Sequence, residues 1–148
     1  MKLSLYPQIP RVLVCGGRDF ADVAAFHDAM DNLDALYDFE TVIHGGASGA
    51  DFLADEWAKL RERKTMVFAV SKSDWRKWGH WAGPRRNQHM LTTSKPNLLI
   101  AFPGGKGTAD MCRRAKLDGV PVISPLEFGF NIDTLKDIEP QFWNLKLV

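Results

Sequence analysis

Three loops that contain glycine hold most of the residues whose chemistry suits a ligand. They are residues 16–20 (GGRDF), 44–51 (HGGASGAD) and 103–110 (PGGKGTAD). Glycine accepts backbone conformations that other residues avoid, and it lets N–H groups approach a ligand closely. At the start of a helix such N–H groups add to the positive end of the helix dipole and favour phosphate. The loops at 45–49 and 104–108 therefore predict anion binding.

Basic and hydroxyl side chains accompany these loops. Arg18 follows the first glycine pair, and Arg86 lies in the first turn of a helix that Pro84 is expected to open. Arginine holds phosphate or carboxylate through paired hydrogen bonds, so both are predicted ligand contacts. Lys106 either pairs with a phosphate or is solvated, and Thr108 either caps a helix or donates to a phosphate.

Aromatic and acidic side chains permit two interpretations each. Trp75, Trp78 and Trp81 recur at every third residue, which is typical of a packed stripe on a short helix. Alternatively, one of these rings stacks on a base. Asp51 and Asp110 lie near helix starts, where a carboxylate stabilises N–H groups or binds ribose hydroxyls.

Several other common kinds of site are disfavoured because the residue spacings that they require are missing. Lys106 is followed by Gly107 rather than Ser or Thr, and no G-x-G-x-x-G occurs in the first loop. The histidines have no zinc-ligand spacing, and Ser48 lacks the G-x-S-x-G elbow of serine hydrolases. His44, at a strand end, either faces the ligand or makes a structural hydrogen bond. We therefore expect no metal and no cofactor.

Short apolar runs alternate with amphipathic ones and must position these loops. Strands are predicted over 12–15, 41–43, 65–70, 97–102 and 120–123, and helices over 21–36, 50–63, 84–93 and 108–117. This alternation predicts an α/β three-layer sandwich with a mainly parallel sheet of about five strands. Right-handed crossovers place every strand-to-helix loop at one edge of the sheet, where such sheets bind ligands.

Length and composition indicate one soluble globular domain. The 148 residues are 45% hydrophobic and 25% charged, with a net charge of +1. This near-neutral charge disfavours nucleic acid and anionic membranes as partners. Cys15 and Cys112 are expected to be buried free thiols, and a reducing, cytoplasmic location is the default. No targeting or membrane segment is recognised.

The single domain is expected to span residues 1–148, with its core over about 11–125. A tail over 126–148 carries Phe128, Phe130, Phe142 and Trp143. These aromatic residues are expected to pack on the core or on a partner, including a second copy of the chain in a homo-oligomer.

Five blocks of sequence, in this order, resemble one known superfamily. They are residues 16–20, 44–51, 74–75, 82–87 and 103–111. The chain is similar over about residues 11–125 to the SLOG superfamily, in the branch of YspA that is related to YpsA. This resemblance implies a Rossmann-like fold and the binding of nucleotides or nucleotide-derived ligands.

The same superfamily includes lonely-guy phosphoribohydrolases, which cleave the N-glycosidic bond of nucleoside monophosphates, and the DNA-processing DprA proteins. The resemblance implies that Arg86 matches the arginine of the phosphoribohydrolases and that residues 103–108 match their PGGxGT. Met111 stands where they have a glutamate. Asp110 is adjacent, but one residue along a helix rotates a side chain by about 100°. Catalysis would therefore need Asp110 or Asp51 in another geometry.

The sequence thus leads to three hypotheses. The first is a binder or sensor of a nucleotide derivative such as an ADP-ribose-like molecule. The second is a nucleotide N-glycosidase, with Arg86 and Asp110 as candidate catalytic residues, and the third is a single-strand nucleic-acid module. The predicted ligand-binding residues are Gly16, Gly17, Arg18, Gly45, Gly46, Ser48, Asp51, Trp75, Arg86, Asn87, Gly104, Gly105, Lys106, Gly107 and Thr108.

Overall fold

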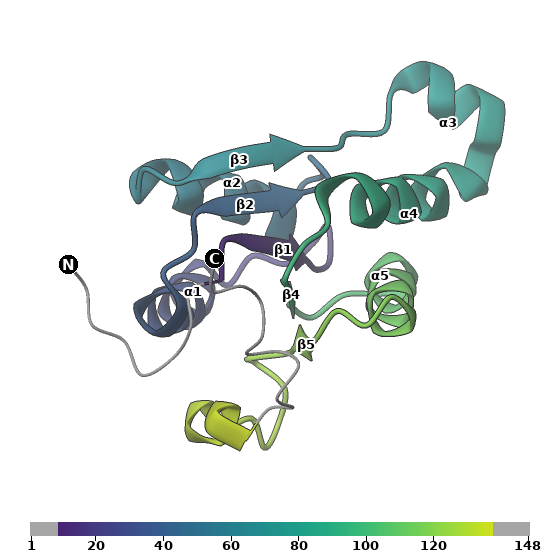
Figure 1. Ribbon diagram of the computed structural model, residues 1–148. Coiled ribbons are helices and arrows are strands. Elements are labelled where there is room, and N and C mark those ends of the chain that lie inside the picture. The colour runs from purple at the N-terminus through teal and green to yellow at the C-terminus, as the bar shows by residue number, and fades with distance from the viewer. Residues whose placement is uncertain (1–8, 138–148) are drawn as a thin grey trace.

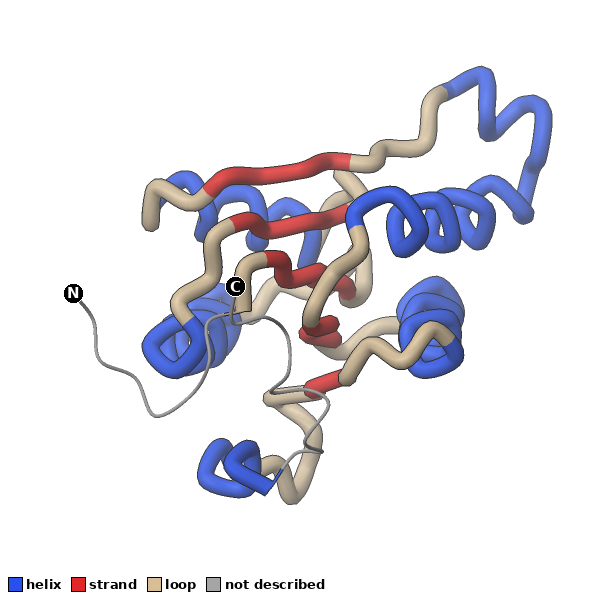
Figure 2. The backbone as a smooth tube through the Cα atoms, viewed as in Figure 1, coloured by secondary structure: helices blue, strands red, loops and turns tan. Residues whose placement is uncertain are grey.

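The computed structural model describes residues 9–137 of the chain. Strands and helices alternate along it (Figures 1 and 2). The strands are β1 (Arg11–Cys15), β2 (Thr41–His44), β3 (Lys64–Val67), β4 (Leu98–Ala101) and β5 (Val122–Ile123). The α-helices are α1 (Val23–Tyr37), α2 (Ala50–Leu60), α3 (Lys72–Trp78), α4 (Ala82–Ser94) and α5 (Lys106–Leu117), and short 3-10 helices cover Gly79–Trp81 and Ile132–Asp137.

All five strands form one parallel sheet in the order β3-β2-β1-β4-β5. In the centre, Val12 of β1 pairs with Val42 on one side and Leu98 on the other. Strands are added outward from β1 first in one direction and then in the other. The predicted α/β fold with a five-stranded sheet is confirmed, and its switch point lies between β1 and β4.

Each face of the sheet buries its own layer of side chains. On one face, Val12 and Val14 pack with Phe26 of α1 and Trp57 of α2. On the other face, Leu13 and Cys15 join a cluster that includes residues of α4 and α5. A strand that is covered on both faces is apolar throughout, which explains the run Val12–Cys15.

Several predicted boundaries shift for local reasons. Helix α5 begins at Lys106, two residues before the predicted start, with Gly105 as its N-cap. Helix α4 begins at Ala82, because a 3-10 turn leads directly into it. Pro84 then lies in the first turn, where its missing N–H costs no helical hydrogen bond. The predicted cap after α5 is confirmed, since Gly119 has φ of +78°.

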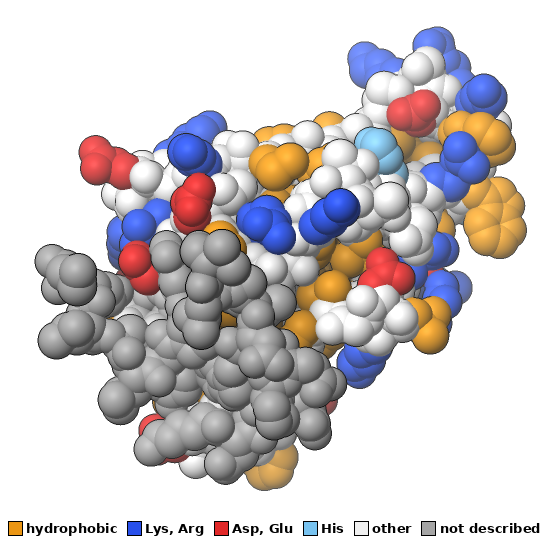
Figure 3. Space-filling view, viewed as in Figure 1, with side chains coloured by type: hydrophobic (Ala, Val, Ile, Leu, Met, Phe, Trp, Pro, Cys, Tyr) orange, Lys and Arg blue, Asp and Glu red, His pale blue; other side chains and the backbone are white. Residues whose placement is uncertain are grey.

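The prediction that the tryptophans form a packed stripe is wrong. Helix α3 has only seven residues, none of them buried, and it extends away from the sheet (Figure 1). Trp75 and Trp81 are 39% and 59% exposed. Basic and apolar side chains lie together over this end of the molecule (Figure 3). This short helix contacts α4 rather than the sheet, and that contact leaves Trp78 half-buried.

The tail packs on the core only in part. Leu135 is buried and Phe130 packs against the α1–α2 side of the sheet, whereas Phe128 is fully exposed. Phe142 and Trp143 lie outside the described residues. Within residues 9–137, no helix is long and apolar enough to cross a bilayer.

Candidate functional site

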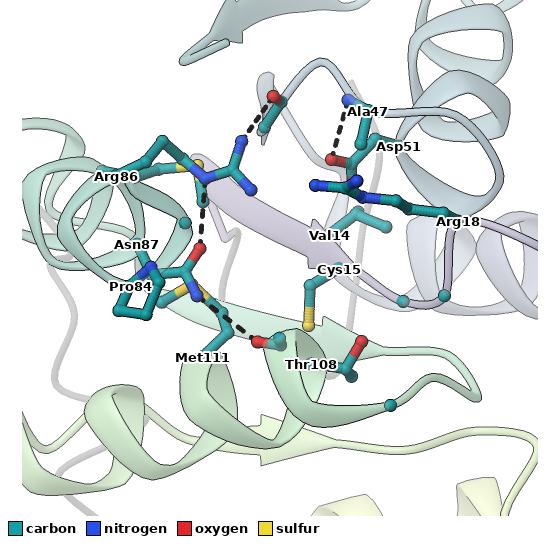
Figure 4. A pocket seen from close by; sticks show the side chains of 17 residues that line it. Val14, Cys15, Arg18, Ala47, Asp51, Pro84, Arg86, Asn87, Thr108 and Met111 are labelled. Carbon is teal, nitrogen blue, oxygen red and sulfur yellow. Dashed lines mark hydrogen bonds between the residues drawn. The ribbon is translucent and has the colours of Figure 1, made fainter. Parts of the chain in front are cut away.

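A cavity of about 310 Å³ opens at the carboxyl ends of β1, β2 and β4 (Figure 4). Its walls come from the end of β1, from the loops after these strands and from residues of α2, α4 and α5. The lining residues are Val14, Cys15, Gly16, Gly17, Arg18, Gly45, Ala47, Asp51, Gly83, Pro84, Arg86, Asn87, Met90, Gly105, Gly107, Thr108 and Met111. The structure therefore brings residues from all three glycine loops to one place.

The glycines allow these loops to pack directly on one another. The N–H of Gly17 donates to the carbonyl of Pro103 at 2.8 Å, and the carbonyl of Gly17 accepts from Ala50 N at 3.1 Å. A Cβ on Gly17 would lie 3.0 Å from the Pro103 oxygen. Any larger residue at this position would push the first and third loops apart. The glycine pattern thus reflects close backbone approach at Gly17.

The start of α5 supplies backbone donors beside the cavity. The first hydrogen bond within the helix runs from Ala109 N to the carbonyl of Gly105, at 3.0 Å. The helix leaves the preceding N–H groups without intrahelical partners, as at every helix start. Gly107 and Thr108, in this first turn, line the cavity. This is the arrangement that favours an anion.

Arg86 crosses the cavity to the loop after β2. Its Nη1 donates to the carbonyl oxygens of Gly45, at 2.6 Å, and Phe68, at 3.2 Å. Its Nε donates to Asn87 Oδ1 at 3.2 Å (Figure 4). A Cβ on Gly45 would lie 2.7 Å from the guanidinium carbon, so glycine at this position makes room for the arginine.

Asp51 is the carboxylate of the cavity wall. It is only 7% exposed, and its Oδ2 accepts from Ala47 N at 3.2 Å. Burial raises the pKa of Asp51, against the opposing effect of its backbone hydrogen bonds and of the nearby His44 and Arg86. Burial also lowers the pKa of Arg86, while Asp51 raises it and Arg18 lowers it. The guanidinium groups of Arg18 and Arg86 and the carboxylate of Asp51 therefore interact across the cavity.

Asp110 has a different environment from Asp51. Its carboxylate accepts from Arg113 at 2.9 Å, from Arg114 at 2.8 Å and from Asn87 Nδ2 at 3.0 Å. Although burial opposes ionisation, the hydrogen bonds from Arg114 and Asn87 lower the pKa of Asp110. Asp110 is absent from the cavity lining, and its role within the described residues is to join α5 to α4.

These two aspartates predict opposite effects on stability. A raised pKa in the folded state means that ionised Asp51 destabilises the fold above its folded pKa, and that this penalty is absent below the unfolded pKa. We therefore expect Asp51→Asn to raise Tm at pH 7, at about 2–4 °C per kcal/mol for a domain of this size, with no gain near pH 3. Asp110→Asn should lower Tm at pH 7, because a lowered pKa stabilises the fold until acid protonates the group. Calorimetric melts at both pH values test the pair, and equal signs would contradict it.

His44 has a structural role and does not line the cavity. Its Nδ1 accepts from Gly46 N at 3.0 Å, so Nε2 carries the proton and donates to Asp55 Oδ1 at 2.9 Å. This chain of hydrogen bonds fixes the loop after β2. Of the two interpretations of His44, the structure supports the structural hydrogen bond.

A second cavity of about 230 Å³ adjoins the first. It contains Gly46, Ser48 and Trp75, and it shares Arg18 and Arg86 with the main cavity. Of the predicted ligand-binding residues, Gly104 and Lys106 line neither space, and both are exposed.

Several apolar residues that line the cavity were not among the predicted ligand-binding residues. Val14 and Cys15 were predicted only as part of a buried strand, Met90 was assigned no role, and Met111 was considered only as a departure from a motif. Their position at a strand end or on an inward helix face is the signal that could have identified them. Cys15 is a buried free thiol. A hydrogen bond with Cys112 and burial raise the pKa of Cys15, and the same bond lowers the pKa of Cys112 to about 7.

Comparisons with known proteins identify relatives of this chain. Residues 10–78 match the model of the YspA, cpYpsA-related SLOG family. The Gene 61 protein of Mycobacterium phage D29 is 36% identical over an alignment of 119 residues, and the match covers 77% of this chain and 94% of that protein.

Two solved structures resemble this chain at low sequence identity. UDP-GlcNAc 2-epimerase from Neisseria meningitidis, bound to UDP-GlcNAc, matches with a TM-score of 0.50 and 15% identity over 89% of this chain. DNA processing protein A from Streptococcus pneumoniae matches with a TM-score of 0.47 and 17% identity over 88% of this chain. The chain spans 36% and 62% of these two proteins, respectively.

Proposed function

We propose that this chain, which belongs to the YspA, cpYpsA-related SLOG family, binds a nucleotide or nucleotide-derived phosphorylated ligand at the carboxyl edge of its sheet. One observation carries the proposal. The first turn of α5 and the side chains of Arg18 and Arg86 meet at a single cavity. Backbone donors at a helix start and arginine side chains are the groups that bind phosphate in proteins.

The rest of the cavity suits the sugar or ring of such a ligand. Its volume of about 310 Å³ lies at the lower end of small-molecule sites. Val14, Met90 and Met111 provide apolar surface, while Asn87 and Thr108 provide polar groups. A few polar groups in a partly apolar cleft fix a ligand's orientation.

The proposal is tested by identifying the ligand that co-purifies with the protein and the chemical group of the ligand that binding requires. Native mass spectrometry of freshly purified protein should show a co-purified phosphorylated nucleotide derivative. Calorimetry should show binding of ribose 5-phosphate and no binding of ribose, because the phosphate provides most of the recognition. Binding of neither, together with a mass spectrum of ligand-free protein, would reject the proposal.

A second function, hydrolysis of the N-glycosidic bond of a nucleotide, is favoured by one observation. Asp51 places a buried carboxylate in the cavity wall, and burial raises its pKa toward the range in which carboxyl groups donate protons. Met111, which cannot exchange a proton, occupies the position that the phosphoribohydrolase resemblance assigns to glutamate. We therefore rank hydrolysis below binding.

A further inference from the structure

The second cavity has a feature that the phosphate site does not explain. It adjoins the main cavity through Arg18 and Arg86, which line both spaces, and Trp75 forms part of its far wall. Phosphate binding uses the arginines and the start of α5. It does not use a large aromatic ring beyond them.

Trp75 differs from the other two tryptophans of its segment. Trp78 lines a third cavity, which shares Ala69, Val70 and Arg86 with the second, and the Arg85 guanidinium lies 3.7 Å from its ring centroid. Trp81 is 59% exposed and lines neither the main nor the second cavity. Trp75 alone of the three faces the second cavity, and it does so from a helix with no buried residue. Core packing therefore does not account for its position.

Charge at the junction of the two cavities favours phosphates there. Arg86 is compensated by Asp51, and its Nη1 and Nε already donate to protein oxygens. The guanidinium of Arg18 lies over the Trp75 ring, 5.4 Å from its centroid. Arg18 also faces the like charge of Arg86. A bound phosphate would therefore attract the Arg18 guanidinium away from the indole ring. This movement would leave the face of the Trp75 ring open.

We propose that Trp75 stacks on the aromatic base of a two-headed ligand. The base occupies the second cavity, phosphates lie between Arg18 and Arg86, and a second sugar or ring occupies the main cavity. The ligand class is thus a nucleoside diphosphate that carries a further sugar or ring. This inference rests on the proposed function, because it requires phosphate at the junction.

The experiment compares three ligands on four proteins. Ribose 5-phosphate, AMP and ADP-ribose are titrated calorimetrically into the wild type and into Trp75→Leu, Trp75→Phe and Trp81→Leu. Wild type should bind ADP-ribose more tightly than AMP, and AMP more tightly than ribose 5-phosphate. Base stacking on an aromatic side chain contributes about 1–3 kcal/mol. Trp75→Leu should therefore bind AMP and ADP-ribose about 5- to 100-fold more weakly, with ribose 5-phosphate unchanged.

The other two variants distinguish stacking from general packing. Trp75→Phe should retain most of the affinity because a smaller ring still stacks, and Trp81→Leu should match the wild type. Equal losses for all three ligands in Trp75→Leu, or no loss for any of them, would overturn the inference while leaving phosphate binding intact. If wild type binds none of the three ligands and purifies free of any nucleotide derivative, the proposed function itself fails. Trp75 is exposed, so circular dichroism should show that each variant folds.

Discussion

Arg86→Ala is expected to weaken the binding of ribose 5-phosphate or a nucleotide by about 10- to 100-fold. The reason is that Arg86 lies at the centre of the site, where it contacts the loops after β2 and β3 and lines both cavities. A lost hydrogen bond to a charged group costs about 1.5–3 kcal/mol. Isothermal titration calorimetry measures the change directly.

Two further variants separate the charge from its placement. Lys77 lies on α3 with its ammonium over Trp78, away from the cavity, so Lys77→Ala should bind like the wild type. Gly45→Ala keeps Arg86 but inserts a methyl group where the guanidinium now lies. Because the displaced group is the end of a flexible side chain, this variant should fold normally and still lose affinity about as much as Arg86→Ala. If Arg86→Ala and Lys77→Ala bind the ligand with equal affinity, Arg86 is not part of the binding site.

Most of the fold follows from apolar patterning alone. The runs at β1, β2 and β4 are buried on both faces, so most of their residues are apolar and the strands are easy to recognise. The edge strand β3 is less clear. The β-rich sequence continues to Val70, but pairing with β2 stops at Val67. Strand length here depends on the partner strand, which local sequence does not reveal.

The tryptophan segment shows where periodicity misleads. Spacing of three residues indicates one helical face but does not reveal whether anything lies against that face. The 3-10 turn at Gly79–Trp81 also ends α3 after Trp78, so the three rings do not share one continuous helix. The spacing therefore could not reveal that these rings form no packed stripe, because that depends on tertiary structure.

The candidate site was predictable as a set of loops, but the relation between its carboxylates was not. Asp51 and Asp110 have similar positions after glycine loops, so the sequence predicts the same roles for both. One helical step turns Asp110 toward Arg113 and Arg114 and leaves Met111 facing the cavity. Asp51 instead faces the cavity directly. Such differences depend on which face of each helix packs against the sheet, and the loop pattern does not reveal that face.

Because Met111 faces the cavity, the residue at this position is expected to affect the hydrolysis of nucleotides. Wild-type protein is expected to release almost no free base from nucleoside monophosphates, and Met111→Glu is expected to raise the rate by about 10²-fold. General acid–base assistance contributes about 10²–10⁴-fold to a rate. The lower end applies because position 111 is only 1% exposed and a buried glutamate needs partners to ionise. Chromatography of each protein incubated with a panel of nucleoside monophosphates measures the release.

Met111→Gln is the matched control, since it has nearly the same shape and polarity as the glutamate variant but no titratable proton. It should show no gain, whereas a gain equal to that of Met111→Glu would trace the rate to a change in packing. Asp110→Asn in the wild-type background should leave the very small release of free base unchanged, because this carboxylate forms ion pairs with Arg113 and Arg114. Robust release by wild type that disappears in Asp51→Asn would instead make the chain an N-glycosidase with Asp51 as its acid. Release that disappears in Asp110→Asn would contradict the placement of that carboxylate outside the cavity.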